Sequence, residues 1–387
     1  MQYIKRDIQA VLKECVKKFP VVSVTGPRQS GKSTLLKKAF PRLPYFNLED
    51  PETRAYASED PKGFLTSAST PVIIDEIQRV PELLSYIQVI VDETGKPGRF
   101  LLSGSQNLLV GESISQTLAG RVAVFSLLPF SLMELKRYHL ENFSVNDWLV
   151  TGNYPRIYDA KIKPDQFYSG YINTYLERDV RAIKNIENMS RFQTFLQLCA
   201  ARTGQMLNFT NLAEESGISL NTAKAWISIL EASYVIFLLR PHFVNYSKRL
   251  VKMPKLYFYD TGLACNLLNI KTGETLEYHP LRGAFFETAI ISEIAKKYYN
   301  SMVRPPIYFW RDKTGHEVDC LIDNEGSLIP IEIKSGKTIQ NKFFKGISHY
   351  QSLSGCGRGF VIYAGDSRQQ RKDVSVYPWD AFHSILK

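Results

Sequence analysis

The 387 residues are 44% hydrophobic and 22% charged, a balance that excludes disordered, collagen-like and low-complexity classes. The chain is longer than a typical single domain, so we expect two or three domains. A formal net charge of +10 favours polyanionic partners such as nucleic acid. The five cysteines form no CxxC pair, which argues against zinc knuckles and a disulfide framework and favours a reducing, cytoplasmic location. Apolar runs fall short of the ~20 residues that span a bilayer, so no membrane partner is expected.

The first part of the chain predicts a doubly wound α/β domain, which we place at residues 1–160. Residues 1–20 carry apolar side chains at helical spacing and too many charges for a signal peptide, so they are predicted to form an amphipathic helix. A β-branched run at 21–25 leads into a glycine-bounded loop and a helix at 33–39. Further apolar runs follow at 72–74, 100–102 and 122–127 with helices between them, which is typical of a mostly parallel sheet covered on both faces.

The rest of the chain predicts two further domains. A short helix at 211–216, a turn at Gly217, a helix at 220–232 behind the N-cap Ser219 and a strand at 234–239 indicate a winged helix-turn-helix, within a helical domain at 161–260. A helix at 284–299, several strands, a helix at 342–352 and a strand at 359–363 indicate a small α/β domain at 261–387.

The loop between the first strand and its helix matches the GxxxxGK[ST] pattern of phosphate-binding loops. Glycines let backbone N–H groups converge on phosphates, the helix N-terminus favours negative charge, and Lys32 can reach the β and γ oxygens. Ser33 is expected to ligate Mg²⁺, so ATP and Mg²⁺ are the expected cofactors. The expected nucleotide-binding residues in this loop are Gly26, Pro27, Arg28, Gln29, Ser30, Gly31, Lys32, Ser33 and Thr34.

Two acids at the end of the strand at 72–74 predict the second half of this site. Asp75 can hold the Mg²⁺ shell, and Glu76 can orient or deprotonate the attacking water. The alternative is a surface acid pair at a strand end. Ser103 or Ser105, after the strand at 100–102, can place a hydroxyl beside the γ-phosphate, although small residues also suit an ordinary turn.

Arg121 is a candidate arginine finger that would neutralise transition-state charge. It could act within its own chain or on a neighbouring subunit of a homo-oligomer. The alternative is an ordinary surface arginine.

These motifs together resemble those of the AAA-type P-loop ATPase family of bacteria and archaea. The matching segments are GPRQSGKST at 26–34, NLEDP at 47–51, DEIQ at 75–78, LSGS at 102–105 and AGR at 119–121. The resemblance favours the role of Arg121. It implies a P-loop NTPase parallel sheet, then a winged helix, then a restriction-endonuclease-like α/β domain of uncertain function, over nearly the whole chain.

The C-terminal domain carries a candidate metal site. Strand periodicity puts Glu332 and Lys334 on one face, and Asp319 can lie beside them if its strand pairs with theirs. Glu287 lies on an apolar helical stripe and needs a partner or a cation. Carboxylates that hold Mg²⁺ and a lysine that positions or activates water are what metal-assisted phosphodiester cleavage needs.

This set looks like the D…ExK core of the PD-(D/E)XK nuclease fold, with Glu287, Asp319 and Glu332 as metal ligands and Lys334 as the catalytic lysine. It departs from that pattern at Val318, where a proline often precedes the first acid. The alternative is a set of charged residues on a half-exposed hairpin.

A basic segment at 240–259 contains no acid and suits a phosphate backbone, with Lys248, Arg249 and Lys252 as expected nucleic-acid contacts. The alternative is a solvated basic loop used for domain packing. The six histidines show no metal-ligand spacing and receive no role.

The sequence therefore predicts an Mg²⁺-dependent ATPase whose nucleotide state controls a winged-helix and nuclease-like module acting on DNA or RNA. One alternative is a non-cleaving ATP-gated switch or interaction protein with a silent nuclease-like domain. A kinase-like phosphotransferase is a third possibility, but Glu76 beside Asp75 favours water as the acceptor.

Overall fold

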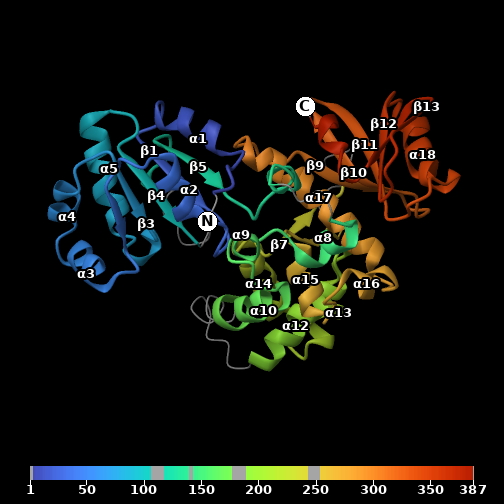
Figure 1. The fold of residues 1–387 in the computed structure, drawn as a ribbon, viewed down its shortest axis with the longest axis horizontal. Coiled ribbons are helices and arrows are strands. Elements are labelled where there is room, and N and C mark those ends of the chain that lie inside the picture. The colour runs from blue at the N-terminus through green and yellow to red at the C-terminus, as the bar shows by residue number, and fades with distance from the viewer. Residues whose placement is uncertain (1–2, 106–116, 139–142, 177–188, 243–252, 387) are drawn as a thin grey trace.

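The computed structural model describes residues 3–105, 117–138, 143–176, 189–242 and 253–386 (Figure 1). Figure 1 shows an N-terminal α/β region at one end, a C-terminal α/β region at the other, and a mainly helical middle region next to both. The expected nucleic-acid contacts Lys248, Arg249 and Lys252 lie outside the described residues.

The N-terminal region is built on a five-stranded parallel sheet, as the sequence predicts. The strand order is β2-β3-β4-β1-β5, so β4 lies between the strand before the loop and the strand that ends in the acids. Its strands are β1 (Val21–Thr25), β2 (Tyr45–Asn47), β3 (Val72–Asp75), β4 (Phe100–Gly104) and β5 (Val122–Ser126). Its helices are α1 (Gln9–Val16), α2 (Lys32–Ala39), α3 (Pro51–Glu59), α4 (Pro61–Ser67) and α5 (Leu83–Thr94).

The carboxyl ends of three strands therefore meet at one edge of this sheet. The loop follows β1, the candidate serines follow β4, and the acids follow β3. Two separate apolar clusters cover the sheet, one containing Val21 and Ile74, the other Val22 and Ile73. The alternation along each strand accounts for the two clusters. The short strand β2 was not predicted.

The first helix is shorter than predicted. It begins at Gln9, and the segment before it contains the buried side chains of Ile4, Arg6 and Ile8. Arg6 is buried there and donates to Glu134 Oε1 at 3.0 Å, to the Ser30 carbonyl at 2.9 Å and to the Leu128 carbonyl at 2.6 Å. An isolated buried charge is costly, so this arginine needs all three partners. The N-terminal segment is thus fixed directly onto the nucleotide loop.

The middle region combines helices with a three-stranded antiparallel sheet in the order β6-β8-β7. The Ser219 hydroxyl accepts a hydrogen bond from the Thr222 N–H and caps α14, as predicted. The strands are β6 (Gln205–Met206), β7 (Ile236–Leu239) and β8 (Lys255–Phe258). The helices are α7 (Leu132–Lys136), α8 (Val145–Thr151), α9 (Pro155–Asp159), α10 (Pro164–Tyr171), α12 (Met189–Ala201), α13 (Phe209–Glu215), α14 (Leu220–Ala232), α15 (Thr261–Leu267) and α16 (Gly273–Glu277).

The C-terminal region has a six-stranded mixed sheet in the order β13-β14-β12-β11-β10-β9. β11, β12 and β14 run parallel, and the other neighbouring pairs run antiparallel. Its strands are β9 (Ile307–Arg311), β10 (Glu317–Asn324), β11 (Ser327–Lys334), β12 (Gly359–Tyr363), β13 (Gln369–Arg371) and β14 (Val374–Pro378). The long helix α17 (Arg282–Asn300) precedes the sheet, and α18 (Lys345–Ser354) packs on β10 and β11.

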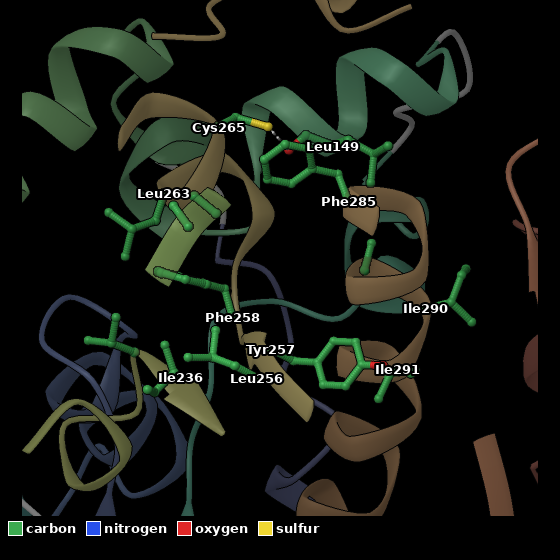
Figure 2. Close-up of a cluster of buried hydrophobic side chains, with 14 of the residues drawn as sticks. Leu149, Ile236, Leu256, Tyr257, Phe258, Leu263, Cys265, Phe285, Ile290 and Ile291 are labelled. Atoms are coloured by element: carbon green, nitrogen blue, oxygen red, sulfur yellow. Dashed lines mark hydrogen bonds between the residues drawn. The ribbon is translucent and has the colours of Figure 1, made fainter. Parts of the chain in front are cut away.

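One apolar cluster joins the middle and C-terminal regions, from Leu132 to Leu386. Figure 2 shows its centre, where Leu149 of α8, Leu263 of α15 and Phe285 of α17 lie around β8. Packing therefore crosses the predicted domain bounds at residues 160 and 260. The division into three functional domains at these bounds stays a prediction. None of the described helices is both long and apolar enough to cross a membrane.

We expect Glu134→Ala to destabilise the protein by about 3–5 kcal/mol, because the change leaves the Arg6 guanidinium buried without its carboxylate. Urea-induced unfolding followed by circular dichroism measures the loss. The matched control is Arg137→Ala, which breaks an exposed ion pair with Asp7 and should cost less than about 1 kcal/mol. Equal losses in the two variants would contradict the importance of the buried pair.

Candidate functional site

The loop at 26–33 has the local geometry that phosphate binding needs. Gly26 has φ +146°, and a Cβ there would lie 2.2 Å from the Leu127 carbonyl oxygen, so only glycine fits. The buried Lys32 ammonium donates to the carbonyls of Gly26 at 3.0 Å and Pro27 at 2.8 Å. These are hydrogen bonds that phosphate oxygens can take over. The loop thus holds its lysine at the place where phosphates would bind.

The space beside the loop fits a polar, anionic ligand. A pocket of about 330 Å³ is lined by loop residues and by Glu76. Among the described residues, the buried Gln29 side-chain oxygen of this pocket and the Ser30 hydroxyl, which lines a neighbouring pocket, have no hydrogen-bond partner. Because buried polar atoms are rarely left without partners, these orphaned atoms indicate a site built for a ligand.

Asp75 lies at the end of β3, where two hydroxyls orient its carboxylate. Ser103 donates to Oδ1, and Tyr45 donates to Oδ2 at 2.5 Å. Burial and the hydrogen bond to Asp75 raise the pKa of Tyr45, so its phenol stays a neutral donor. Ser33 is a further hydrogen-bond partner of Tyr45. The two expected Mg²⁺ ligands, Ser33 and Asp75, therefore contact the same phenol.

Glu76 is held in an unusual position. Its φ is +60°, a left-handed conformation that costs a non-glycine residue about 1 kcal/mol or more and clusters at functional sites. Burial raises the pKa of this carboxyl, with the Asp75 charge adding and the Lys32 charge opposing. Gln78 donates to its Oε2, and Ser105 lies 3.3 Å from the same atom. Both candidate serines thus contact an acid, and their role as sensors stays a prediction.

Arg121 lies away from the loop in its own chain. It directly precedes β5, whose first residue pairs with Val21 at the start of β1, whereas the loop follows the end of β1. Five residues of strand separate the two edges by about 13 Å or more. Arg121 forms a two-pronged ion pair with Asp92 at that far edge. Action within the same chain is therefore wrong for this conformation, and action on a neighbouring subunit stays a prediction.

A second, larger pocket of about 680 Å³ adjoins the opposite side of the loop, and both pockets share Gly31 and Thr34. Its other walls come from the N-terminal segment and from residues after β5, including Tyr3, Ile4 and Tyr158. Aromatic and aliphatic walls next to a phosphate loop suit the base and sugar of a nucleotide. Sequence reasoning missed these residues, because they are far apart in the chain.

In the C-terminal region, the structure brings Asp319, Glu332 and Lys334 together. Lys334 Nζ lies 3.0 Å from Asp319 Oδ2 and pairs with Glu332, and the backbone N–H of Ile333 donates to Asp319 at 2.7 Å. β10, which carries Asp319, pairs antiparallel with β11, which carries Glu332 and Lys334. The sequence predicts the contact only if these two strands pair.

Glu287 of α17 faces the same cluster but has its own cation. Lys255 Nζ lies 3.1 Å from Glu287 Oε1 and also pairs with Glu317, and Tyr257 donates to Glu287 at 2.5 Å. Lys255 is 4% exposed. The sequence placed this lysine in a basic surface segment, and the structure corrects that interpretation: β8 carries it into the acid cluster.

The charges in this cluster shift one another. Burial and then the Asp319 charge raise the pKa of Glu287 to about 7 and raise the pKa of Glu332 well above its usual value. Burial also works to raise the pKa of Asp319, but the Lys334 charge and hydrogen bonds outweigh it and hold the pKa of that carboxyl low. Burial works to lower the pKa of Lys334, but the charges of Asp319 and Glu332 outweigh it and raise that pKa. Lys334 is therefore protonated at neutral pH and suits charge neutralisation rather than proton abstraction from water.

Comparison with known families divides the chain into three matched parts. Residues 18–136 match a family described as an AAA domain. Residues 142–274 and 282–382 match two families described as domains of unknown function, DUF8612 and DUF4143. The P-loop and the acids at 75–76 lie within the first match.

Two mycobacterial relatives match almost the whole chain. They are "Uncharacterized protein Rv2008c" of Mycobacterium tuberculosis and "Uncharacterized protein Mb2031c" of Mycobacterium bovis, each 31% identical over 379 residues, which cover 96% of this chain and 82% of the relative. Among solved structures, the Walker-type ATPase PABY2304 of Pyrococcus abyssi is similar at a TM-score of 0.45 and 16% identity, covering 68% of this chain and 95% of that chain.

We expect Gly346→Ala to destabilise the protein by about 1–3 kcal/mol, because a Cβ at this position of α18 would lie 1.9 Å from Glu332 Oε1 and 2.4 Å from the Glu317 carbonyl. Alanine normally stabilises a helix by up to about 1 kcal/mol relative to glycine, so a loss is informative. The measurement is the free energy of unfolding in urea.

Gly357→Ala is the control for this change. A Cβ at Gly357 meets no atom within 4 Å, so the free energy of unfolding should stay within about 0.5 kcal/mol. An increased free energy of unfolding for Gly346→Ala would contradict the close packing of α18 against Glu332.

Proposed function

Because this chain belongs to the same family as the two mycobacterial proteins and carries an AAA-type P-loop ATPase domain, we propose that it hydrolyses ATP with Mg²⁺. We further propose that nucleotide binding controls the middle and C-terminal regions. The observation that carries the proposal is the meeting of Lys32, Asp75 and Glu76 at the carboxyl edge of one parallel sheet. A lysine for phosphate, an acid for the metal and an acid for water are the parts that hydrolysis needs.

Each residue has a role that follows from its surroundings. Lys32 exchanges its hydrogen bonds to two loop carbonyls for phosphate oxygens. Ser33 and Asp75 would hold Mg²⁺, which when bound neutralises charge on the β and γ oxygens. The raised pKa of Glu76 makes its carboxylate a better acceptor for the proton of water. The base would lie in the pocket lined by Tyr3, Ile4 and Tyr158.

We expect Lys32→Ala to lower kcat/KM for ATP by about 100-fold or more, because the variant loses a positioned charge on the phosphates. Glu76→Gln should lower kcat by a similar factor while leaving ATP affinity close to that of the native protein. Phosphate release and equilibrium binding of a fluorescent ATP analogue measure the two effects.

Lys18→Ala is the matched control for these variants, because Lys18 lies exposed on the same region away from the loop. It should keep native turnover. Native turnover in Lys32→Ala would overturn the assignment of the site.

Contacts from the middle region to the ATPase region, and from α17 to the segment that leads from β5 into α7, support control by the nucleotide. Tyr234, in the turn between α14 and β7, lies 2.9 Å from the hydroxyl of Thr25, the residue before the loop. On α17, Glu293 accepts from the Leu132 N–H at 2.7 Å, and Lys296 donates to the Phe130 carbonyl at 3.0 Å. A shift of the loop or of the segment after β5 would therefore move both regions.

The middle region supports a winged helix as the element that is moved. The order α12, β6, α13, α14, β7, β8, with β8 between β6 and β7, is that of a helix-turn-helix followed by a hairpin. Together with the net charge of +10 and the basic segment at 240–259 without the buried Lys255, this arrangement supports DNA or RNA as the partner.

The acid cluster supports two outcomes for the nuclease-like module. Asp319, Glu332 and Lys334 fit an Mg²⁺-dependent cleavage site by their chemistry. Lys255 favours the non-cleaving alternative, because it already neutralises Glu287, the helical acid of that site. A cation would have to displace this ammonium before Glu287 could serve as a ligand.

Measuring cleavage together with ATP turnover separates the two outcomes. If the module cleaves, native protein with Mg²⁺ or Mn²⁺ cuts DNA or RNA, and Lys334→Ala lowers cleavage by about 100-fold while ATP turnover persists. The control is Lys337→Ala, because Lys337 is an exposed lysine near the cluster. This variant should cleave nucleic acid as the native protein does. If native protein cuts none of the single- and double-stranded substrates tested, the non-cleaving switch replaces the nuclease.

A further inference from the structure

Three side chains outside both sites meet where the turn between β9 and β10 lies against α18. Asp312 follows β9, His316 precedes β10, and His349 lies on α18. One ligand atom from each lies within 4.8 Å of the other two. Sequence spacing did not predict this group, because His349 is remote in sequence from the other two residues.

The distances match those within a metal coordination shell. Asp312 Oδ2 lies 3.2 Å from His316 Nδ1 and 3.2 Å from His349 Nε2. Ligand atoms about 2.05 Å from a tetrahedral Zn²⁺ are separated from one another by about 3.3 Å. The two separations agree with those of neighbouring ligands around one ion, and they are also hydrogen-bond distances.

The turn also holds Asp312 in a fixed orientation. Its other oxygen, Oδ1, accepts hydrogen bonds from the Thr314 N–H at 2.8 Å, the Thr314 hydroxyl at 2.8 Å and the His316 N–H at 2.9 Å. Metal-binding carboxylates are commonly oriented by such outer hydrogen bonds.

Both imidazole rings converge on one oxygen of this carboxylate. The two imidazole rings stack with centroids 3.9 Å apart and planes 19° apart, and both direct a nitrogen at the same carboxylate oxygen. A neutral imidazole donates through one of its nitrogens, so the two rings can also hydrogen-bond to that oxygen without a metal, and His316 Nδ1 lies 2.8 Å from the Thr314 hydroxyl as well.

We propose that Asp312, His316 and His349 bind one divalent transition metal of the Zn²⁺ type, completed by water. Two imidazole nitrogens and one carboxylate oxygen form a ligand set for Zn²⁺ and its neighbours, whereas Mg²⁺ prefers oxygen ligands alone. His316 is 48% exposed, which leaves room for the water and for access of the ion. The ion would fasten the β9–β10 turn to α18, and these elements also frame the acids at 319 and 332.

Titration with Co²⁺ in excess Mg²⁺ tests the proposal, because Mg²⁺ competes at oxygen-only sites and Co²⁺ reports nitrogen ligands by its visible absorption. Native protein should bind one equivalent with the strong bands of a four-coordinate ion, and Zn²⁺ should displace it. His316→Ala and His349→Ala should each weaken binding at least about 10-fold, and Thr314→Val, which keeps all three ligands, about 10-fold.

His279→Ala is the matched control, because His279 lies in the turn before α17, where its ring accepts from the Leu281 N–H. It should bind like the native protein, and metal-free circular dichroism should match for all variants. Equal Co²⁺ binding in native protein, His316→Ala and His349→Ala would overturn the proposal. A signal lost in Asp319→Asn but kept in His316→Ala would also overturn it, because it would assign the ion to the acid cluster.

Discussion

The buried ion pair between Arg6 and Glu134 is the interaction on which the arrangement of the nucleotide region depends. Arg6 joins the N-terminal segment to the Ser30 carbonyl of the loop and to the Leu128 carbonyl after β5. Glu134 accepts from the Arg6 guanidinium and from two backbone N–H groups. Because neither charge can be left alone in the interior, the loop, the N-terminal segment and the start of α7 are fixed relative to one another. The wall of the larger pocket follows from this constraint.

The features that the sequence predicted well have causes close in the chain. β1, β12 and α14 have the predicted bounds, because β-branched runs and the Ser219 cap are local signals. The phosphate loop belongs to the same class. Tyr45 was missed because β2 has three residues and shows no period, and Arg6 because its partners lie up to 128 positions away. Lys255 was misplaced because a lysine in a basic segment is normally exposed.

The acid cluster shows how stability and chemistry depend on the same charges. Two lysines, Lys255 and Lys334, form ion pairs with four carboxylates from α17, β10 and β11. Such pairs hold the helix to the sheet without a metal, since an unpaired carboxylate would be costly there. Any cation that enters must compete with these ammonium groups. The same residues therefore suit either a cluster that only stabilises the fold or a metal-dependent catalytic site. Whether a metal ion displaces the lysine ammonium groups from the carboxylates distinguishes the two.

The apolar clusters divide the molecule differently from its three family matches. Those that cover the N-terminal sheet lie within residues 8–127, whereas a single cluster continues from Leu132 to Leu386. Mechanically the protein then consists of two bodies, with the residues around 128–134 as the joint between them. A protein truncated after this joint would keep the N-terminal sheet intact. A truncation between the middle and C-terminal regions would instead disrupt the apolar core that the two regions share. Leu128 in this joint also packs against Tyr234 and Tyr259, and Tyr234 contacts the Thr25 hydroxyl, so ATP would reposition the second body through these contacts together with the joint.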